Sequence, residues 1–315
     1  LYYYRITALD NAGNVTSYTS DVSSLPHVID GNYALSFDGS NDDVNVPTSS
    51  NIDAISSALT VSAWIKPTQF SSGDHPKILQ RSEGTGGGVD RWIFNWSPNS
   101  DSYGVQFGVF NSSTAQEVKG VSSIPLNIWT HVAATFNSGS VVIYVNGVAD
   151  KSSTISFTSL SHVQGVDIKI GSSTNNSFFK GSMDDIGIWN EALTASEITA
   201  LYNSGLPLAN SSNSGNYTSS SNLQGYWRFN ENTGAVAYDL SGNGNNGTIN
   251  GSTSVTPGAS NVPVLAVTSS SSNATYKIGD VIPVNITFGA AVTVSGTPQL
   301  TLETGTSDAV VDYTS

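Results

Sequence analysis

Acidic side chains gather in one short turn of this chain. The turn Asp38-Gly39-Ser40-Asn41-Asp42-Asp43 offers three carboxylates and an amide on a tight, glycine-containing loop. Calcium is a hard cation that takes about six to eight oxygen ligands from carboxylates, amides, carbonyls and water. The turn, with Asp38 and Asp43 at its ends, is therefore a candidate calcium site. The alternative is that these residues occupy turn positions that need a left-handed backbone.

Aromatic side chains recur at every second position between Trp92 and Trp96. Residues two apart in a β-strand share a face, so Trp92, Phe94 and Trp96 point the same way. Proteins that bind carbohydrate present aromatic faces beside amide donors and acceptors, which makes Trp92, Trp96 and Asn95 candidate glycan-binding residues. The alternative is a core strand, because aromatic side chains with this period more often fill the interior of a sandwich.

No local motif of the sequence indicates catalysis. The chain contains no cysteine, which excludes disulfides, thiolate catalysis and cysteine-ligated zinc. No Gly-Xaa-Ser-Xaa-Gly motif marks a serine nucleophile. The sequence therefore favours binding over chemistry.

The composition is that of an all-β protein, and its acidic balance suits an extracellular one. Charged residues make up only 11% of the chain, whereas β-branched and aromatic residues abound. The net charge of −13 argues against nucleic acid and anionic membranes as partners, because both are bound by clustered lysine and arginine. No apolar run approaches the ~20 residues of a membrane helix. The absence of cysteine favours a bacterial or archaeal surface protein, because secreted eukaryotic modules more often carry disulfides.

Short strands with turns between them are expected from Asn32 to about Leu208. Leu59–Lys66 and Trp129–Phe136, for example, alternate apolar and polar residues. Regular short strands of this kind are typical of a sandwich or jelly roll. One helix is predicted after the capping box Thr194–Glu197, with a stop at Gly205.

Four sequence segments follow one another in a fixed order. They read ALSFDGSNDDVNV, LTVSAWIKP, WTHVAATFNSGSVVIYVNGV and FFKGSMDDIGIWNEALTASEITALYNSG. In this order they resemble the laminin-G-like, concanavalin-A-like lectin and glucanase superfamily in its bacterial form, over well more than half of the chain. The resemblance implies a jelly-roll β-sandwich with one short helix.

The resemblance also implies metal ligands. In related domains that bind calcium, the ion lies where this chain has Asp239, Asn243 and one of Asp184 and Asp185. The Asp38–Asp43 turn is a second possibility. The alternative is that these side chains satisfy backbone donors and turn positions.

Hydrolytic activity is not implied. Glycoside hydrolysis needs a pair of carboxylates, which glucanases of this superfamily carry as Glu-x-Asp-x-x-Glu on one strand. Here Met183 and Ile188 stand in place of both glutamates, and only Asp185 matches. Losing both glutamates removes the nucleophile and the acid together, so the expected module is not an enzyme.

Both ends of the chain resemble pieces of other β-sandwich domains. Residues 1–24 look like the last two strands of a fibronectin type III domain, and residues 262–315 resemble the opening half of a bacterial immunoglobulin-like surface repeat. The laminin-G-like sandwich is expected between them, over residues 30–257.

One segment departs from the order of the family. The block at 223–252 usually opens the domain, but here it follows the helix and a polar loop at 209–222. It is either the start of a truncated second copy or a displaced piece that closes the first sandwich. The second alternative is favoured, because an isolated strand pair is unable to bury its apolar face.

These expectations describe a non-catalytic extracellular module of a large bacterial surface or secreted protein. It would bind glycan or protein, with calcium in a structural role. Two alternatives stay open: a purely structural spacer in a surface stalk, and a carbohydrate-targeting module of a secreted polysaccharide-degrading enzyme.

If calcium binds, a chelator should lower the melting temperature. Free ion at ~100 times Kd stabilises a folded protein by about 2.7 kcal/mol, a large share of the stability of a single domain. Thermal melts with added calcium and with EDTA measure this effect. An unchanged midpoint in EDTA would remove the calcium hypothesis.

Overall fold

The computed structural model describes most of the chain between residues 33 and 259, together with four later strands. The described residues are 33–69, 75–81, 92–98, 103–111, 114–160, 165–173, 177–205, 207–255, 259, 264–269, 284–288, 299–302 and 309–312. The chain divides into two compact units, residues 31–261 and the remainder. The predicted fibronectin-like hairpin at 1–24 lies outside the described residues.

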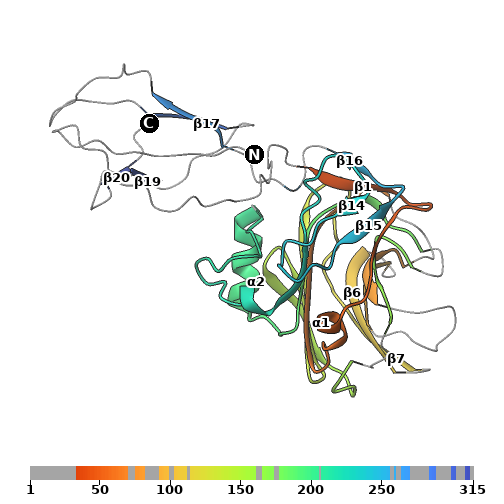
Figure 1. Cartoon of the computed structure of the whole chain (residues 1–315). Coiled ribbons are helices and arrows are strands. Elements are labelled where there is room, and N and C mark those ends of the chain that lie inside the picture. Colours follow the sequence, from red (N-terminus) through yellow and green to blue (C-terminus); the bar gives the residue numbers. More distant parts are fainter. Residues whose placement is uncertain are drawn as a thin grey trace. The chain divides into compact units, whose positions relative to one another are not determined.

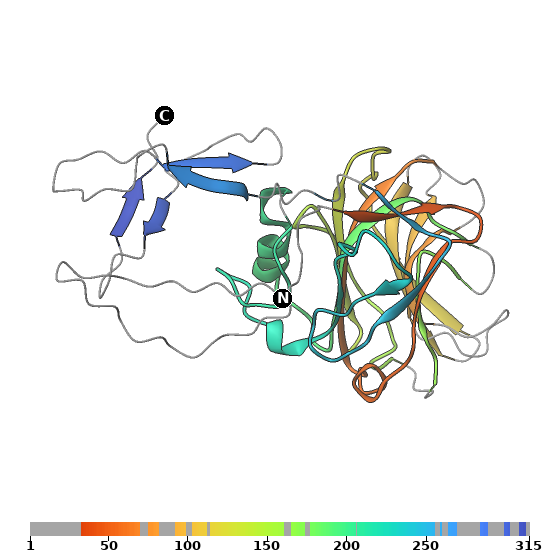
Figure 2. The same cartoon turned by 45° about the horizontal axis from the view of Figure 1, so that its top comes forward.

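The unit 31–261 is a sandwich of two antiparallel sheets, here called sheet I and sheet II (Figures 1 and 2). The strand order of sheet I is β10-β9-β8-β3-β12-β1-β16, and β13 also pairs with β12. Sheet II has the order β14-β15-β2-β11-β4-β5-β6-β7. This architecture confirms the predicted all-β sandwich class.

The strands of sheet I are β1 (Ala34–Asp38), β3 (Ala58–Pro67), β8 (Thr130–Asn137), β9 (Ser140–Val145), β10 (Val148–Thr154), β12 (Lys180–Trp189), β13 (Leu223–Trp227) and β16 (Thr253–Val255). Those of sheet II are β2 (Asp43–Val46), β4 (Lys77–Arg81), β5 (Trp92–Pro98), β6 (Tyr103–Asn111), β7 (Thr114–Lys119), β11 (Ile168–Ile170), β14 (Val236–Ala237) and β15 (Gly247–Asn250).

Alternation of apolar residues along the strands builds the core between the sheets. In β3, Leu59, Val61 and Ile65 are fully buried members of the main core cluster. In β5, the rings of Trp92, Phe94 and Trp96 belong to the same cluster. Because neighbouring residues of a strand point to opposite faces, these side chains also decide which residues face outward.

The helix α2 (Ala195–Tyr202) covers part of the outer face of sheet I. Thr194 caps it and forms the predicted capping box with Glu197. Ile198 and Leu201 are buried against side chains of β8, β9 and β12. The helix ends at Tyr202, earlier than the predicted stop at Gly205, because Asn203 adopts a left-handed conformation with φ 44°. A short helix α1 (Ser50–Asp53), which the sequence analysis did not predict, follows β2.

The segment after the polar loop takes part in both sheets. Strand β13 pairs with β12 and β16 pairs with β1 in sheet I, while β15 pairs with β2 in sheet II. Trp227 and Phe229 of this segment are fully buried in the main core. The loop at 209–222 also contributes a buried residue, Tyr217, whose hydroxyl accepts a hydrogen bond from Trp189 Nε1 at 2.9 Å.

Two glycines make room for tryptophan rings in neighbouring strands. A Cβ on Gly187 would lie 2.4 Å from the ring of Trp189, and a Cβ on Gly225 would lie 2.4 Å from the ring of Trp227. In both strands the ring folds back over the residue two positions earlier. Only glycine allows so close an approach.

The later strands form two pairs: β17 (Val264–Ser269) with β18 (Val284–Phe288), and β19 (Gln299–Leu302) with β20 (Ala309–Asp312). The immunoglobulin-like assignment of residues 262–315 stays a prediction.

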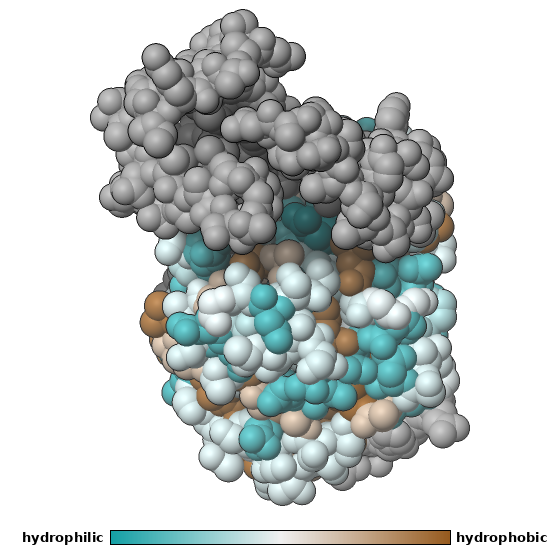
Figure 3. All heavy atoms as spheres, turned by 60° about the vertical axis from the view of Figure 1, so that its left-hand side comes forward, coloured by the Kyte–Doolittle hydropathy of each residue, from teal (hydrophilic) through white to brown (hydrophobic). Residues whose placement is uncertain are grey.

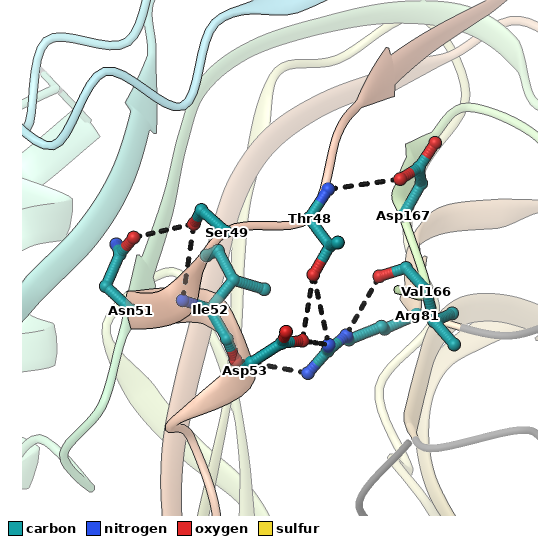
Figure 4. A network of polar contacts seen from close by, with 8 residues as sticks. All are labelled: Thr48, Ser49, Asn51, Ile52, Asp53, Arg81, Val166 and Asp167. Atoms are coloured by element: carbon teal, nitrogen blue, oxygen red, sulfur yellow. Dashed lines mark hydrogen bonds and ion pairs between the residues drawn. The ribbon is translucent and has the colours of Figure 1, made fainter. Parts of the chain in front are cut away.

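A buried arginine ties two segments, residues 48–53 around α1 and the loop before β11, to the end of β4 (Figure 4). Arg81, which is 4% exposed, donates to the carbonyl oxygens of Val166 and Ile52 at 3.1 Å each. Its guanidinium also forms an ion pair with Asp53 and a hydrogen bond of 3.3 Å with Thr48. Removing this side chain would take a donor from the Val166 and Ile52 carbonyls and leave Asp53 without its ion-pair partner.

We expect Arg81→Met to lower the free energy of unfolding by about 3 kcal/mol, because breaking a buried ion pair leaves its partner groups uncompensated. Lys169→Met is the matched control. Lys169 pairs with Asp43 at 3.0 Å but is 27% exposed, so its loss should be at most about 1 kcal/mol. Urea unfolding of both variants measures the difference, and equal losses would contradict the role given to Arg81.

Candidate functional site

The two outer faces of the sandwich differ in what covers them. The outer face of sheet I packs against α2 and Tyr217. On sheet II, strands β4 to β7 direct Leu79, Phe94, Phe107 and Val118 into the core. The residues between these positions form the outer face.

Four outer-face residues of sheet II lie in register across neighbouring strands. Lys77 is opposite Asn95, Asn95 is opposite Gln106, and Gln106 is opposite Lys119. We call Lys77, Asn95, Gln106 and Lys119 the transverse row. It places two amides in the middle of the row, on β5 and β6, with a lysine at either end. Gln80, opposite Ile93 on the same face, lies in the adjacent row.

The amides of this region are buried, yet several of their polar atoms have no hydrogen-bond partner. The atoms are Asn95 Nδ2 and Oδ1, Gln106 Oε1 and Gln80 Nε2. The three residues are at most 2% exposed. An unsatisfied buried donor or acceptor costs about 1–3 kcal/mol, so a group of them calls for a ligand or ordered water that completes their bonds.

Two buried glycines flank Gln106 on β6. Gly104 and Gly108 share its face of β6. A Cβ on Gly108 would meet Ile93 Cγ1 at 3.0 Å and Glu117 Cγ at 3.2 Å. Side chains of neighbouring strands therefore already occupy the space over Gly108.

The chemistry available here is hydrogen bonding in both directions. Each amide offers a carbonyl acceptor and two N–H donors, and each lysine offers three donors. Among the described outer-face residues of β4 to β7, Glu117 is the single carboxylate. Hydrolysis of a glycosidic bond needs two such groups, so this arrangement suits binding.

The structure divides the predicted glycan-binding residues between the two faces of β5. Trp92 and Trp96 are 2% and 1% exposed, and their rings lie in the core. These two tryptophans are therefore core residues, and neither presents a ring on which a sugar could stack. Asn95 points the other way and belongs to the transverse row. Gln80 and Gln106 were missed. In the sequence, each of these glutamines is a polar residue among the apolar residues of a strand, which could have indicated that its side chain points away from the core.

The surface around the described sandwich is largely polar. Figure 3 shows one face on which hydrophilic and intermediate residues predominate and hydrophobic residues are scattered. The exposed large hydrophobic residues are Val121, Ile128, Val148, Val236 and Tyr238. No helix among the described residues is long and apolar enough to cross a membrane.

Asp239, a predicted calcium ligand, holds together the loop that follows β14. Its Oδ1 accepts hydrogen bonds from the backbone N–H groups of Tyr226 and Ser241, both at 2.9 Å. Its Oδ2 accepts from Ser241 Oγ and from the backbone N–H of Asn245, both at 2.8 Å. Asn243 donates to a backbone carbonyl of β13 at 2.8 Å. Asp239 does not fit the role of a cation ligand here, because its two carboxylate oxygens already accept four hydrogen bonds and a cation would compete with these for the oxygen lone pairs.

Asp184 and Asp185 are buried and also have internal partners. Asp184 accepts from the backbone N–H groups of Asp185 and Ala259, both at 2.8 Å. Asp185 accepts a hydrogen bond from the Tyr226 hydroxyl and pairs with Arg228 at 3.1 Å. Burial and the neighbouring charge of Asp185 raise the pKa of Asp184 well above its ordinary value.

The other predicted ligands lie in the turn between β1 and β2. Asp38 accepts from the backbone N–H of Ser40 at 2.7 Å, and Asp43 accepts from Lys169 and Ser172 at 3.0 Å each. The structure therefore distributes the six predicted ligands over three local networks. Within the described part of the chain, no three acidic or histidine side chains gather closely enough to hold a metal ion.

Comparison with known proteins assigns the sandwich to a family. The model of the concanavalin A-like lectin/glucanases superfamily, in its laminin-G form, matches residues 38–199, slightly more than half of the chain. The chain belongs to this superfamily. The flanking residues 1–24 and 262–315 lie outside the match. No curated protein matches the chain.

Several solved structures resemble this chain at low sequence identity. A Bacteroides ovatus protein assigned to carbohydrate binding is 21% identical with a TM-score of 0.51, over 76% of this chain and 66% of that one. Domain 4 of an extracellular arabinanase from Geobacillus stearothermophilus, in complex with arabinotriose, is 23% identical with a TM-score of 0.43, over 54% of this chain and 76% of that one. The CBM40 domain of a Ruminococcus gnavus sialidase, bound to sialyllactose, is 16% identical with a TM-score of 0.44, over 54% of this chain and 96% of that one.

In this member of the superfamily a buried histidine lies under α2. His131 Nε2 is 2.8 Å from Ser62 Oγ, whereas its Nδ1 has no hydrogen-bond partner. Its ring centroid is 5.4 Å from that of Trp64. Without a group to orient Nδ1 and without exposure, this pair lacks the arrangement of a nucleophile and base. Burial lowers the pKa of His131 from 6.5 to about 3.

His131 should make folding sensitive to acid. Below pH 6.5 the unfolded chain binds a proton at His131, while the folded protein does not until about pH 3. Stability is therefore lost as the pH falls through 6.5, by about 1.4 kcal/mol per pH unit from this group. Urea unfolding between pH 7 and pH 4.5 should show a shallower pH dependence for His131→Gln than for the wild type.

Ser62→Ala is the control for this experiment, because it removes the hydrogen bond but keeps the buried imidazole. It should retain the wild-type slope. Parallel curves for His131→Gln and the wild type would contradict the assignment.

Proposed function

We propose that the sandwich is a non-catalytic carbohydrate-binding module, and that a saccharide binds on the outer face of sheet II over the transverse row. The observation that carries this proposal is the group of buried, unpartnered amide atoms on Asn95, Gln106 and Gln80. These residues are at most 2% exposed, so a bound saccharide would supply the bonds that their atoms lack after displacing the groups that cover them.

Saccharide hydroxyls suit this group of amides. A hydroxyl both donates and accepts, so it matches the free donors of Asn95 and Gln80 as well as the free acceptors of Asn95 and Gln106. Membership of a superfamily that contains lectins supports the same ligand class. The fold is also shared with a protein assigned to carbohydrate binding, of which this chain spans 66%.

The setting of the module belongs to the same proposal. We place it in an extracellular bacterial surface or secreted protein, between a fibronectin-like and an immunoglobulin-like neighbour, where it would serve adhesion or recognition. The unpartnered amides favour binding over a purely structural spacer. A targeting role beside a polysaccharide-degrading domain is the second candidate, because it would use the same saccharide site.

Calcium stays a prediction of this proposal, with the turn between β1 and β2 as its place. Burial and the neighbouring charges of Asp38 and Asp43 raise the pKa of Asp42 in this turn. A cation beside Asp42 would relieve this repulsion, with water and backbone carbonyls as further ligands, because three acidic side chains do not gather closely enough there to hold it by themselves.

Gln106→Met separates binding from folding. The substitution keeps the length of the side chain and removes an unpartnered buried oxygen, so the free energy of unfolding should stay the same or rise by about 1 kcal/mol. Saccharide binding by the full chain should fall at least tenfold. A glycan array identifies the saccharide, and calorimetry with it compares the variants.

Thr60→Val is the matched control on sheet I. Thr60 is buried, but its hydroxyl donates to the Glu191 carbonyl at 2.6 Å and accepts from the Leu193 N–H at 2.9 Å. Its removal should lower stability and leave binding unchanged. The proposed function is wrong if the wild-type chain binds no saccharide, or if Gln106→Met binds as tightly as the wild type.

A further inference from the structure

We propose that Tyr238 forms a stacking subsite for a neutral saccharide at the β14 edge of sheet II. This inference rests on the proposed function for its ligand class and adds a contact outside the transverse row. It starts from the exposure of Tyr238, whose side chain is 53% exposed. Among the aromatic side chains that the structure describes, it is the only exposed one.

Strand alternation places Tyr238 on the outer face of the sheet. Ala237 lies in the core, so Val236 and Tyr238 on either side of it point away from the core. Val236 is opposite Thr248 of the neighbouring strand β15 (Figure 1). Because the two strands are antiparallel, Asn246 comes opposite Tyr238. We call Val236, Tyr238, Asn246 and Thr248 the edge platform, and all four residues are exposed.

The edge platform combines apolar surface with accessible hydrogen-bonding groups. The ring of Tyr238 and the side chain of Val236 offer an apolar surface on which the C–H face of a sugar ring can pack. Asn246 uses its Oδ1 as an acceptor within the loop, and its amide N–H donors stay accessible to a ligand. The exposed Thr248 hydroxyl both donates and accepts. A sugar ring over Tyr238 would therefore find partners for its hydroxyls on β15.

The backbone that carries the ring is held by side chains around it. The Tyr238 N–H donates to Glu231 Oε1 at 2.8 Å, and the Asp239 N–H donates to Asn246 Oδ1 at 2.9 Å. The carboxylate of Asp239 accepts four further hydrogen bonds. A stacked ligand therefore has only the side-chain torsions of the ring to fix, which keeps the entropic cost of binding low.

The outer face beside the platform carries no net charge. From Thr248 the row continues across Asn45 of β2 to Lys169 of β11. Lys169 pairs with Asp43 at 3.0 Å, and these two are the only charged residues on the outer face of β14, β15, β2 and β11. Neither sign of charge is left over on these strands for an ionic ligand, so a neutral saccharide complements them best.

A second copy of the chain is the alternative occupant of this edge, because edge strands can pair with other chains. A stable protein interface buries about 1,200–2,000 Å² around an apolar centre. Strand β14, however, spans only Val236–Ala237, and the platform has just two large apolar side chains. An apolar surface of this extent matches a sugar ring better than a protein.

Calorimetry of the full chain with cellohexaose, xylohexaose and mannohexaose tests the inference with neutral probes. We expect at least one probe to bind the wild type, and Tyr238→Ala to lower that affinity by roughly tenfold or more, because the stacking surface is lost. Tyr238→Phe keeps the ring and should stay within about threefold of the wild type. Added salt should leave the affinity unchanged, since screening acts on charged groups.

Ile128→Ala is the matched control, because Ile128 is 57% exposed and lies just before β8 of sheet I. It should leave the affinity unchanged. Both positions are exposed, so the urea midpoints of Ile128→Ala and Tyr238→Ala should match that of the wild type, and lost binding is then not lost folding.

Three results would overturn the inference: none of the probes binds, Tyr238→Ala binds as tightly as the wild type, or Tyr238→Phe binds as weakly as Tyr238→Ala. Sedimentation of the wild type and Tyr238→Ala detects the alternative occupant. A dimer that is lost in Tyr238→Ala, with saccharide affinity unchanged, would assign the platform to a second copy.

The two proposals fail in different ways. If Gln106→Met loses affinity and Tyr238→Ala does not, the subsite is wrong and the proposed function remains. If Tyr238→Ala loses affinity and Gln106→Met does not, the subsite is supported and the transverse row is not the binding site. If neither the three probes nor any saccharide of the glycan array binds, both proposals are wrong.

Discussion

The packing of the β5 aromatic rings between the two sheets is the interaction on which the site depends. Trp92, Phe94 and Trp96 fill the interior from one face of the strand. Because a strand alternates its faces, this packing turns Asn95 outward. The same constraint acts on β6, where Phe107 points inward and Gln106 outward. The side chains that pack into the core thus determine which residues of β5 and β6 face outward in the transverse row.

The buried polar groups of the two sheets differ in whether they have hydrogen-bond partners. Most of those on sheet I have partners: Thr60 bonds to backbone groups, and Asp184 and Asp185 satisfy backbone donors, a tyrosine and an arginine. On sheet II, Asn95, Gln106 and Gln80 keep unpartnered atoms close together. Unsatisfied buried groups lower stability, and they are retained most readily where a ligand completes them.

Several carboxylates of this acidic chain hold loops of the sandwich in place. Asp239 accepts three hydrogen bonds from its own loop and one from β13, and Asp53 pairs with the buried Arg81. Such carboxylates hold loops in place of the disulfides that the cysteine-free chain lacks. Two of the few basic residues, Lys77 and Lys119, lie at the ends of the transverse row.

The sequence by itself determined the all-β class, the capped helix after Thr194 and the superfamily, because these follow from local alternation, capping residues and segment order. It left open whether Trp92 and Trp96 face a ligand or the core, since alternation defines two faces without saying which one is buried. The calcium ligands and the flanking domains remain predictions. Only the tertiary structure aligned Lys77, Asn95, Gln106 and Lys119. Their register depends on the packing of whole strands against the opposite sheet, and no single segment of sequence contains that information.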